Sequence, residues 1–270
     1  MGSLTSRFDV QIDVLMTIEE RTRHEAQSGG DVAGREYWES TWSAAKPVLY
    51  PGRVFQFAPL AEKHLPKTKG LRLIELGAMP GNHLVYFNKE FGYRVCALDY
   101  VADISIVEQT FAINGVRDFE IVNCNLFEFS PAEKFDVVFS VGLVEHFEDW
   151  RAIWNKHTEL LKPGGYLFIG LPNTRFLHWV LMKLFCPSIL AVHRTYLMSP
   201  KVLGRLSAET DLDVLFCNYI ATYRPFYPVP APVGFLNRVI IKLLNLSGLG
   251  EVPNRFASPF IFLVARKNRA

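Results

Sequence analysis

Acidic residues and glycines near the middle of the chain have a spacing that suits ligand binding. Glu75 ends a short apolar run and is followed by Gly77 and Gly81, and Asp99 closes a second apolar run 18 residues after Gly81. Glycine lets the backbone approach a ligand closely, and an acid after the second strand can accept hydrogen bonds from ribose hydroxyls. The spacing predicts the first β-α-β unit of a nucleotide-handling α/β domain.

The chemistry of this turn favours a cationic ligand over a dinucleotide. A dinucleotide motif needs a third glycine, and this chain has Leu84 there. Glu75 would also repel a pyrophosphate placed at the turn. S-adenosylmethionine has an ammonium, a sulfonium and a ribose but no phosphate, and it fits an acid at this position. The alternative from the turn alone is a strand-turn-helix that binds nothing, because isolated glycine motifs are weak signals.

These residues need a sheet to position them. Short runs rich in Val, Ile, Leu, Phe and Tyr predict strands, and helix-like stretches separate them, at 71–75, 93–98, 119–123, 135–140 and 165–170. Such alternation predicts parallel strands with helices on both faces. Ligands then bind beyond the carboxyl ends of the strands, where Glu75, Asp99, Asn125 and residues 140–146 fall.

The ordered set of motifs resembles the class I S-adenosylmethionine-dependent methyltransferases, in particular the type 11/12-like domain. The resemblance covers roughly residues 65–173, and its segments are 71–81, Asp99, 123–127, 135–147 and 160–169. It implies a Rossmann-like α/β fold with a doubly wound, mostly parallel seven-stranded sheet. It also implies an N-terminal helical extension and a C-terminal cap insertion, with segments 211–220 and 259–265 as the last two strands.

The resemblance implies a cofactor site for S-adenosylmethionine. Its residues would be Glu75, Gly77, Ala78, Met79, Gly81, Asp99, Tyr100, Asn125, Leu126, Val141 and Gly142. Two of them depart from the family pattern. Met79 replaces a glycine and would crowd or shape the pocket for the methionine tail. Asn125 stands where an acid is common, and its amide can still donate and accept near adenine.

The acceptor side of the site is less defined. His146 follows the fourth predicted strand, and a histidine there is a candidate general base at neutral pH. The alternative is that His146 only holds the turn. The predicted acceptor-binding residues are Tyr37, Trp38, His146, His178, His193, Arg194 and Tyr196. Glu75, Asp99 and His146 do not form a recognisable metal motif, so the sequence predicts no metal site.

The chain divides into three predicted regions. Residues 1–65 form a helical extension or lid, with a helix expected over residues 10–23 and with Trp38 and Trp42 on one helical face. Residues 66–173 form the cofactor-binding half. Residues 174–270 complete the domain and carry two extra apolar blocks, 176–192 and 235–244. These blocks either fill an enlarged core, cap a hydrophobic acceptor, dock at a membrane surface or form a homodimer contact.

Composition constrains the partners and the compartment. A net charge of +2 without a basic run argues against nucleic acid. The four cysteines form no C-x-x-C pair, which is consistent with reduced thiols. Residues 1–30 lack an apolar segment with a cleavage site, so a cytoplasmic location is expected, with peripheral membrane contact as an addition.

The expected activity is methyl transfer in a biosynthetic pathway. The acceptor is expected to be a hydroxyl on a small molecule, a glycan or a lipid-linked precursor. One alternative is N- or C-methylation of a hydrophobic small molecule. Another is an inactive, methyltransferase-like binding or scaffold protein, an alternative that Met79 keeps open.

Overall fold

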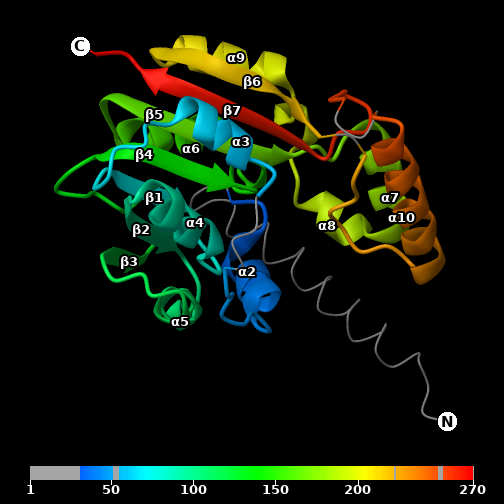
Figure 1. Cartoon of the computed structure of the whole chain (residues 1–270), viewed down its shortest axis with the longest axis horizontal. Coiled ribbons are helices and arrows are strands. Elements are labelled where there is room, and N and C mark those ends of the chain that lie inside the picture. Colours follow the sequence, from blue (N-terminus) through cyan, green and yellow to red (C-terminus); the bar gives the residue numbers. More distant parts are fainter. Residues whose placement is uncertain (1–30, 51–54, 222, 249–251, 270) are drawn as a thin grey trace.

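A mixed seven-stranded sheet forms the centre of the molecule (Figure 1). The computed structural model describes residues 31–50, 55–221, 223–248 and 252–269. The strand order is β3-β2-β1-β4-β5-β7-β6, and only β7 runs antiparallel to its neighbours. The strands are β1 (Arg72–Leu76), β2 (Arg94–Asp99), β3 (Phe119–Asn123), β4 (Phe135–Val141), β5 (Leu161–Pro172), β6 (Leu212–Ile220) and β7 (Phe260–Lys267). The predicted doubly wound, mostly parallel sheet is confirmed.

Alternating side chains of the strands build two separate cores. In β1, Leu73 faces one core and Ile74 faces the other, because successive side chains of a strand point to opposite faces. The first core contains side chains of α3 (Ala58–His64), α4 (Asn82–Phe91) and α5 (Ser105–Ile113). The second contains side chains of α6 (Trp150–Glu159), α9 (Pro200–Glu209) and the short helices η1 (Val144–His146) and η2 (Thr195–Leu197).

The predicted strands agree with the observed ones except at the start of β5. This strand begins at Leu161, four residues before its predicted start, and Leu161 pairs with Phe135 of β4 across a register shift. The predicted helix after Gly81 is confirmed as α4, which runs from Asn82 to Phe91. The predicted helix over residues 10–23 lies outside the described residues.

A second layer of helices lies at one end of the sheet and forms the cap. Helices α7 (Phe176–Phe185), α8 (Pro187–Ala191) and α10 (Ala231–Leu246) gather at the right of Figure 1, where the arrows of β4 and β5 point. Met182, Cys186, Leu190 and Tyr227 form a small buried cluster of their own. No helix in the described part of the chain is long and apolar enough to span a bilayer.

One buried histidine in the sheet-facing side of α6 makes stability depend on pH. His157 is fully buried; its Nδ1 donates to the carbonyl of Ile153 at 2.7 Å, and its Nε2 lies 2.9 Å from the Ser140 hydroxyl, which donates to it. Burial disfavours the charged imidazole and lowers the pKa of His157 to about 4. The unfolded chain therefore binds a proton at a higher pH than the folded chain does.

We expect this histidine to destabilise the protein in mild acid. Above the pKa of histidine in the unfolded chain, protonation of His157 does not lower the free energy of unfolding. As the pH falls from that pKa toward 4, the free energy of unfolding decreases, by about 2 kcal/mol between pH 7 and pH 5. His157→Gln removes this titration, so its free energy of unfolding should decline less over that interval. Urea unfolding of both proteins at pH 7 and pH 5 measures the difference. Equal losses in both proteins would contradict the assignment.

Candidate cofactor and acceptor site

A cavity of about 720 Å³ opens where the strand order reverses, beyond the carboxyl ends of β1, β2 and β4. Its walls come from the strand-end loops and from α2 (Gly34–Trp42). The lining residues are Asp31, Gly34, Arg35, Trp38, Trp42, Gly77, Met79, Pro80, Asn82, His83, Leu98, Asp99, Tyr100, Cys124, Asn125, Leu126, Phe127, Val141, Gly142, Leu143 and Phe147.

Asp99 holds its carboxylate in the cavity wall at the end of β2. Its Oδ2 accepts a hydrogen bond from the backbone N–H of Met79 at 2.9 Å, and its Oδ1 accepts one from Tyr100 at 2.8 Å. Burial raises the pKa of Asp99, and these two backbone donors oppose that rise. Each carboxylate oxygen retains a lone pair, so the group can still accept hydrogen bonds from a diol.

Glu75 is buried beside the cavity at the end of β1. Its Oε1 lies 2.7 Å from Nδ1 of His83, which lines the cavity, whereas its Oε2 has no hydrogen-bond partner among the described residues. Burial raises the pKa of Glu75, and the His83 ring partly offsets this effect. A buried carboxylate oxygen without a donor fits a cationic group, because an unpaired buried charge is costly.

Two glycines let the backbone form the cavity floor. Gly77 and Gly142 have φ values of +73°, a conformation that side chains other than glycine rarely adopt. A Cβ added at Gly77 would lie 3.3 Å from Cδ1 of Leu143, and one at Gly142 would lie 3.7 Å from Glu145. Glycine at position 77 therefore lets the turn after β1 lie close to Leu143 in the turn after β4.

The loop after β3 supplies a polar edge with an apolar wall. The side-chain oxygen of Asn125 accepts a hydrogen bond from Phe127 N at 3.0 Å, which fixes the amide plane. Its Nδ2 has no hydrogen-bond partner among the described residues and remains a donor at the cavity edge. Leu126 and Phe127 line the same wall, so the loop suits a flat aromatic ring with an exocyclic polar group.

Helix α2 closes the cavity with two tryptophans. Trp38 and Trp42 both line it, and the helix is tied down by Arg35, whose guanidinium lies 4.4 Å from the centre of the Tyr100 ring. Just before the helix, the Val32 N–H donates to the carbonyl of His146 at 2.6 Å. The helix thus bridges the ends of β2 and β4 and excludes water from one side of the cavity.

Behind Trp38 lies a group of three titratable side chains, of which Glu145 and His146 are buried and His193 is partly buried. The ring of His146 contacts Trp38 edge to face with centroids 4.8 Å apart, and the ring of His193 lies 4.6 Å from that of His146. Burial lowers the pKa of His146 to about 3 and raises the pKa of Glu145 to about 8. A histidine with so low a pKa is a weak proton acceptor at neutral pH, and His146 itself does not line the cavity.

The structure brings most of the predicted cofactor residues together and leaves several acceptor residues apart. Those that line the cavity are Gly77, Met79, Asp99, Tyr100, Asn125, Leu126, Val141, Gly142 and Trp38. Those outside its lining are Glu75, Ala78, Gly81, Tyr37, His146, His178, His193, Arg194 and Tyr196. His178 is buried in the cap, where its two ring nitrogens contact the Tyr227 hydroxyl and the Ala257 carbonyl.

Sequence reasoning missed Arg35, His83 and Phe127 as cavity residues. His83 carries a usable signal, because it begins the helix that follows the glycine turn and lies eight residues after Glu75. Phe127 belongs to segment 123–127 of the resemblance, whereas Arg35 has no such signal. Their positions depend on where α2 and the loop after β3 fold back onto the strand ends.

A family profile described as a methyltransferase domain matches residues 52–215, which is more than half of the chain. The chain belongs to the class I S-adenosylmethionine-dependent methyltransferases. The match spans β1 to β5 and the strand-end loops that line the cavity. The cofactor of this family is S-adenosylmethionine, and the carboxylate of Asp99 and the polar edge of the cavity fit it.

Curated relatives match only in part. The ubiquinone biosynthesis O-methyltransferase of Bradyrhizobium sp. (strain ORS 278) is 28% identical over 111 residues, which is 41% of this chain and 44% of the relative. Phosphoethanolamine N-methyltransferase 1 of Zea mays is 22% identical over 41% of this chain and 24% of the relative. The chain thus matches less than half the length of these relatives.

Solved structures agree with the fold over a longer span. Phosphoethanolamine N-methyltransferase 2 of Haemonchus contortus, in complex with S-adenosyl-L-methionine, aligns with a TM-score of 0.57 at 14% identity, covering 92% of this chain and 60% of the other. The cyclase SpnF aligns with a TM-score of 0.56 at 13% identity, covering 86% of this chain and 92% of the other. At these identities the likeness concerns the fold.

Proposed function

We propose that this methyltransferase transfers a methyl group from S-adenosylmethionine to a hydroxyl of a hydrophobic acceptor held at a membrane surface. The observation that carries the proposal is the pairing of an aromatic-walled cavity with an exposed apolar cap at the same end of the molecule. Support for oxygen as the nucleophile comes from the match to a ubiquinone biosynthesis O-methyltransferase. The match to phosphoethanolamine N-methyltransferases makes nitrogen the alternative.

The cavity residues suit the parts of the cofactor. Asp99 would accept hydrogen bonds from the ribose, and Asn125 and Leu126 would flank the adenine. Glu75, which lies beside the lining against His83, would meet the ammonium of the methionine tail. The bound cofactor supplies a methyl group that its sulfonium already activates. The chain therefore needs chiefly to align an acceptor and exclude water, and general-base catalysis adds less.

The wall formed by α2 serves this alignment. Trp38 and Trp42 present apolar surface to the cavity, and the Arg35–Tyr100 contact holds their helix over it. A flat or aliphatic acceptor would bind against these rings through apolar contact. His146 supports the wall by its edge-to-face contact with Trp38. In this proposal His146 positions the acceptor wall. It would act as a base only if a chain of hydrogen bonds carried a proton to it from the cavity.

The cap exposes apolar side chains that a water-soluble surface normally buries. On α7, Trp179, Val180 and Leu184 are 45%, 48% and 67% exposed, and on α10, Phe235 and Leu243 are 62% and 60% exposed. A patch of this kind on a single chain marks an interaction surface. The exposed members of the blocks at 176–192 and 235–244 are thus available for contact, whereas Met182, Cys186 and Leu190 pack into a buried cluster.

The positive charges around these helices favour an anionic lipid surface as the partner. Residues 176–208 and 214–250 contain no aspartate or glutamate at all. Exposed bases lie among the apolar side chains, namely Lys183, Arg224, Arg238, Lys242 and Arg255. Apolar side chains with bases among them are typical of surfaces that lie in the headgroup region of anionic bilayers. A hydrophobic acceptor could then pass from the bilayer to the cavity.

Calorimetry and a transfer assay together test the function. S-adenosylhomocysteine should bind the chain with one site and NADH should not, because the turn after β1 disfavours pyrophosphate. Radiolabelled S-adenosylmethionine should then label lipids extracted from membranes when the enzyme is present. Binding without any transfer to lipid, glycan or small-molecule fractions would favour the scaffold alternative, and tight NADH binding would overturn the cofactor assignment.

Replacing Met79 tests whether the unusual turn is compatible with catalysis. Met79 is 7% exposed and lines the cavity, but its interaction with Asp99 is made by the backbone N–H. Met79→Gly keeps that hydrogen bond, so affinity for S-adenosylhomocysteine should change by less than about fivefold, or about 1 kcal/mol. Calorimetry on both proteins measures it. If only Met79→Gly binds, the natural chain is the inactive scaffold.

A further inference from the structure

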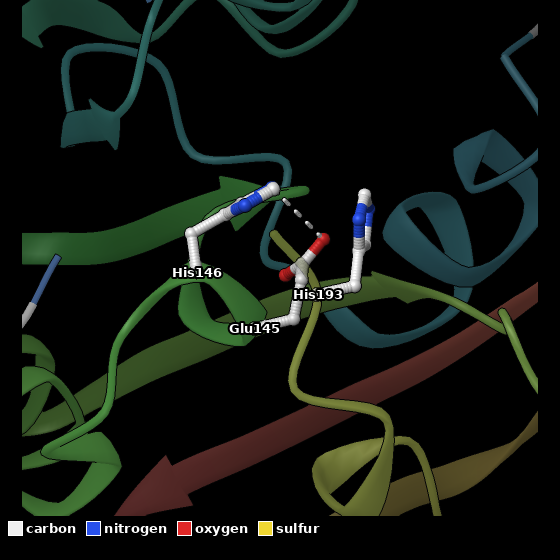
Figure 2. A group of neighbouring side chains, drawn as sticks. All are labelled: Glu145, His146 and His193. Carbon is white, nitrogen blue, oxygen red and sulfur yellow. Dashed lines mark ion pairs between the residues drawn. The ribbon is translucent and has the colours of Figure 1, made fainter. Parts of the chain in front are cut away.

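Three side chains with metal-binding chemistry converge outside the cofactor cavity. Glu145 and His146 belong to η1 after β4, and His193 belongs to the segment that follows α8 in the cap (Figure 2). One potential ligand atom from each lies within 4.8 Å of the others. The three residues come from two segments 47 residues apart in the chain, so their meeting results from the docking of the cap onto the sheet.

The hydrogen bonds of both histidines leave a lone pair directed away from the backbone. Nδ1 of His146 lies 2.8 Å from the carbonyl oxygen of Val192, and Nδ1 of His193 lies 2.5 Å from that of Ile189. A carbonyl only accepts, so each Nδ1 carries the proton and each Nε2 is unprotonated. A hydrogen bond from the other ring nitrogen to a carbonyl in this way fixes and orients imidazoles bound to metals.

The carboxylate between them has no donor. Glu145 is fully buried, and neither of its oxygens has a hydrogen-bond partner among the described residues. Its Oε1 is 3.8 Å from Nε2 of His146, which is too long for a hydrogen bond. With Glu145 ionised, two bare imidazole nitrogens and a carboxylate face one another as three acceptors, an arrangement that a cation would satisfy.

We propose that Glu145, His146 and His193 bind a divalent transition-metal ion such as Zn²⁺. Two neutral imidazoles and one carboxylate are a ligand set used for zinc and for iron(II). Ligand atoms in a tetrahedral zinc site with bonds of about 2.0–2.1 Å lie about 3.4 Å apart, so the side chains would draw together by about 1.5 Å at most. The remaining coordination positions would be filled by water or by a group of the acceptor.

A metal ion at this position would connect the cap to the sheet. The backbone already joins the same two segments, because the Arg194 N–H donates to the Glu145 carbonyl at 2.8 Å. An ion held by both segments would fasten the cap to the end of β4. It would also lie behind Trp38, whose ring packs against His146, and would thereby fix the acceptor wall of the cavity.

Metal titration of an untagged chain tests the site. After dialysis against a chelator, the protein should bind about one equivalent of Zn²⁺. In a separate titration it should bind about one equivalent of Co²⁺, which should absorb visible light when bound. Bound Zn²⁺ should raise the melting temperature by several degrees. His193→Ala and Glu145→Gln should each weaken metal affinity by about 100-fold or more, since even loss of an outer-shell partner costs 10- to 100-fold.

Two controls separate a metal site from incidental binding or misfolding. His64→Gln removes a histidine of α3 outside the cluster and should leave both the stoichiometry and the affinity unchanged. His193 is only partly buried, so His193→Ala should fold and keep its affinity for S-adenosylhomocysteine within about twofold. Absence of stoichiometric binding by the parent would overturn the proposal. So would equal binding by the parent, His193→Ala and Glu145→Gln.

Discussion

Asp99→Ala should weaken S-adenosylhomocysteine binding by about tenfold or more. The change removes a charged acceptor that can bind the ribose diol, and hydrogen bonds to charged groups contribute about 1.5–3 kcal/mol. It also removes the acceptor for the Met79 and Tyr100 N–H groups, so the turn after β1 loses its anchor to β2. Isothermal calorimetry gives the dissociation constants of the two proteins directly.

A surface aspartate supplies the matched control for this substitution. Asp118 lies at the other edge of the sheet, where its Oδ2 is 2.9 Å from Arg94 Nε and its side chain is 65% exposed. Exposed ion pairs contribute little to stability, so Asp118→Ala should bind the ligand as the parent does. Asp99→Asn keeps the size of the side chain and one acceptor oxygen, and it should fall between the parent and Asp99→Ala. Unchanged affinity in Asp99→Ala would remove Asp99 from the cofactor site.

The strands and the cofactor half were predictable because their signals are local. Each strand is a short apolar run, and Gly77, Gly81 and Asp99 have fixed spacings within one β-α-β unit. Parallel strands place their carboxyl ends at one edge, so the residues that follow them meet by topology alone. That is why Asp99, Asn125 and Gly142 line one cavity although they come from three different strands.

The acceptor side was less predictable because long-range packing decides it. His193 meets Glu145 and His146 only after the cap folds onto η1, and no periodicity in the chain reports that contact. Glu75, Asp99 and His146 form no metal motif in the sequence, and Glu145, His146 and His193, which do converge, are not spaced as a motif either. Arg35 reaches Tyr100 across 65 residues for the same reason.

Hydrophobic pattern alone also left the role of the cap undecided. A run such as residues 176–185 has the same composition whether it fills a core or faces a bilayer. The structure separates the two roles within one helix: Met182 and His178 of α7 are fully buried, whereas Leu184 is 67% exposed. The exposed members, and not the whole block, are therefore the residues to change.

Replacing exposed leucines of the cap by aspartate should abolish most membrane binding without unfolding the protein. Leu184→Asp combined with Leu243→Asp removes two apolar side chains, which are 67% and 60% exposed, and adds two negative charges. Each immersed leucine contributes up to about 1.5–3 kcal/mol, and each charge near an anionic surface about 1 kcal/mol. We expect partitioning into phosphatidylserine-containing vesicles to fall by about 100-fold or more, as measured by flotation.

A second double variant has the same change in net charge but lies away from the cap. Leu49 and Ile113 are 66% and 50% exposed, so Leu49→Asp combined with Ile113→Asp should float with the vesicles as the parent does. Both double variants should melt within a few degrees of the parent, since exposed substitutions cost little stability. They should also keep its affinity for S-adenosylhomocysteine, because none of the four residues lines the cavity. A parent that stays in solution with anionic vesicles would end the membrane proposal. If the parent and both double variants float equally, Leu184 and Leu243 have no part in binding the lipid. The exposed apolar side chains of the cap would then contact a partner other than the membrane.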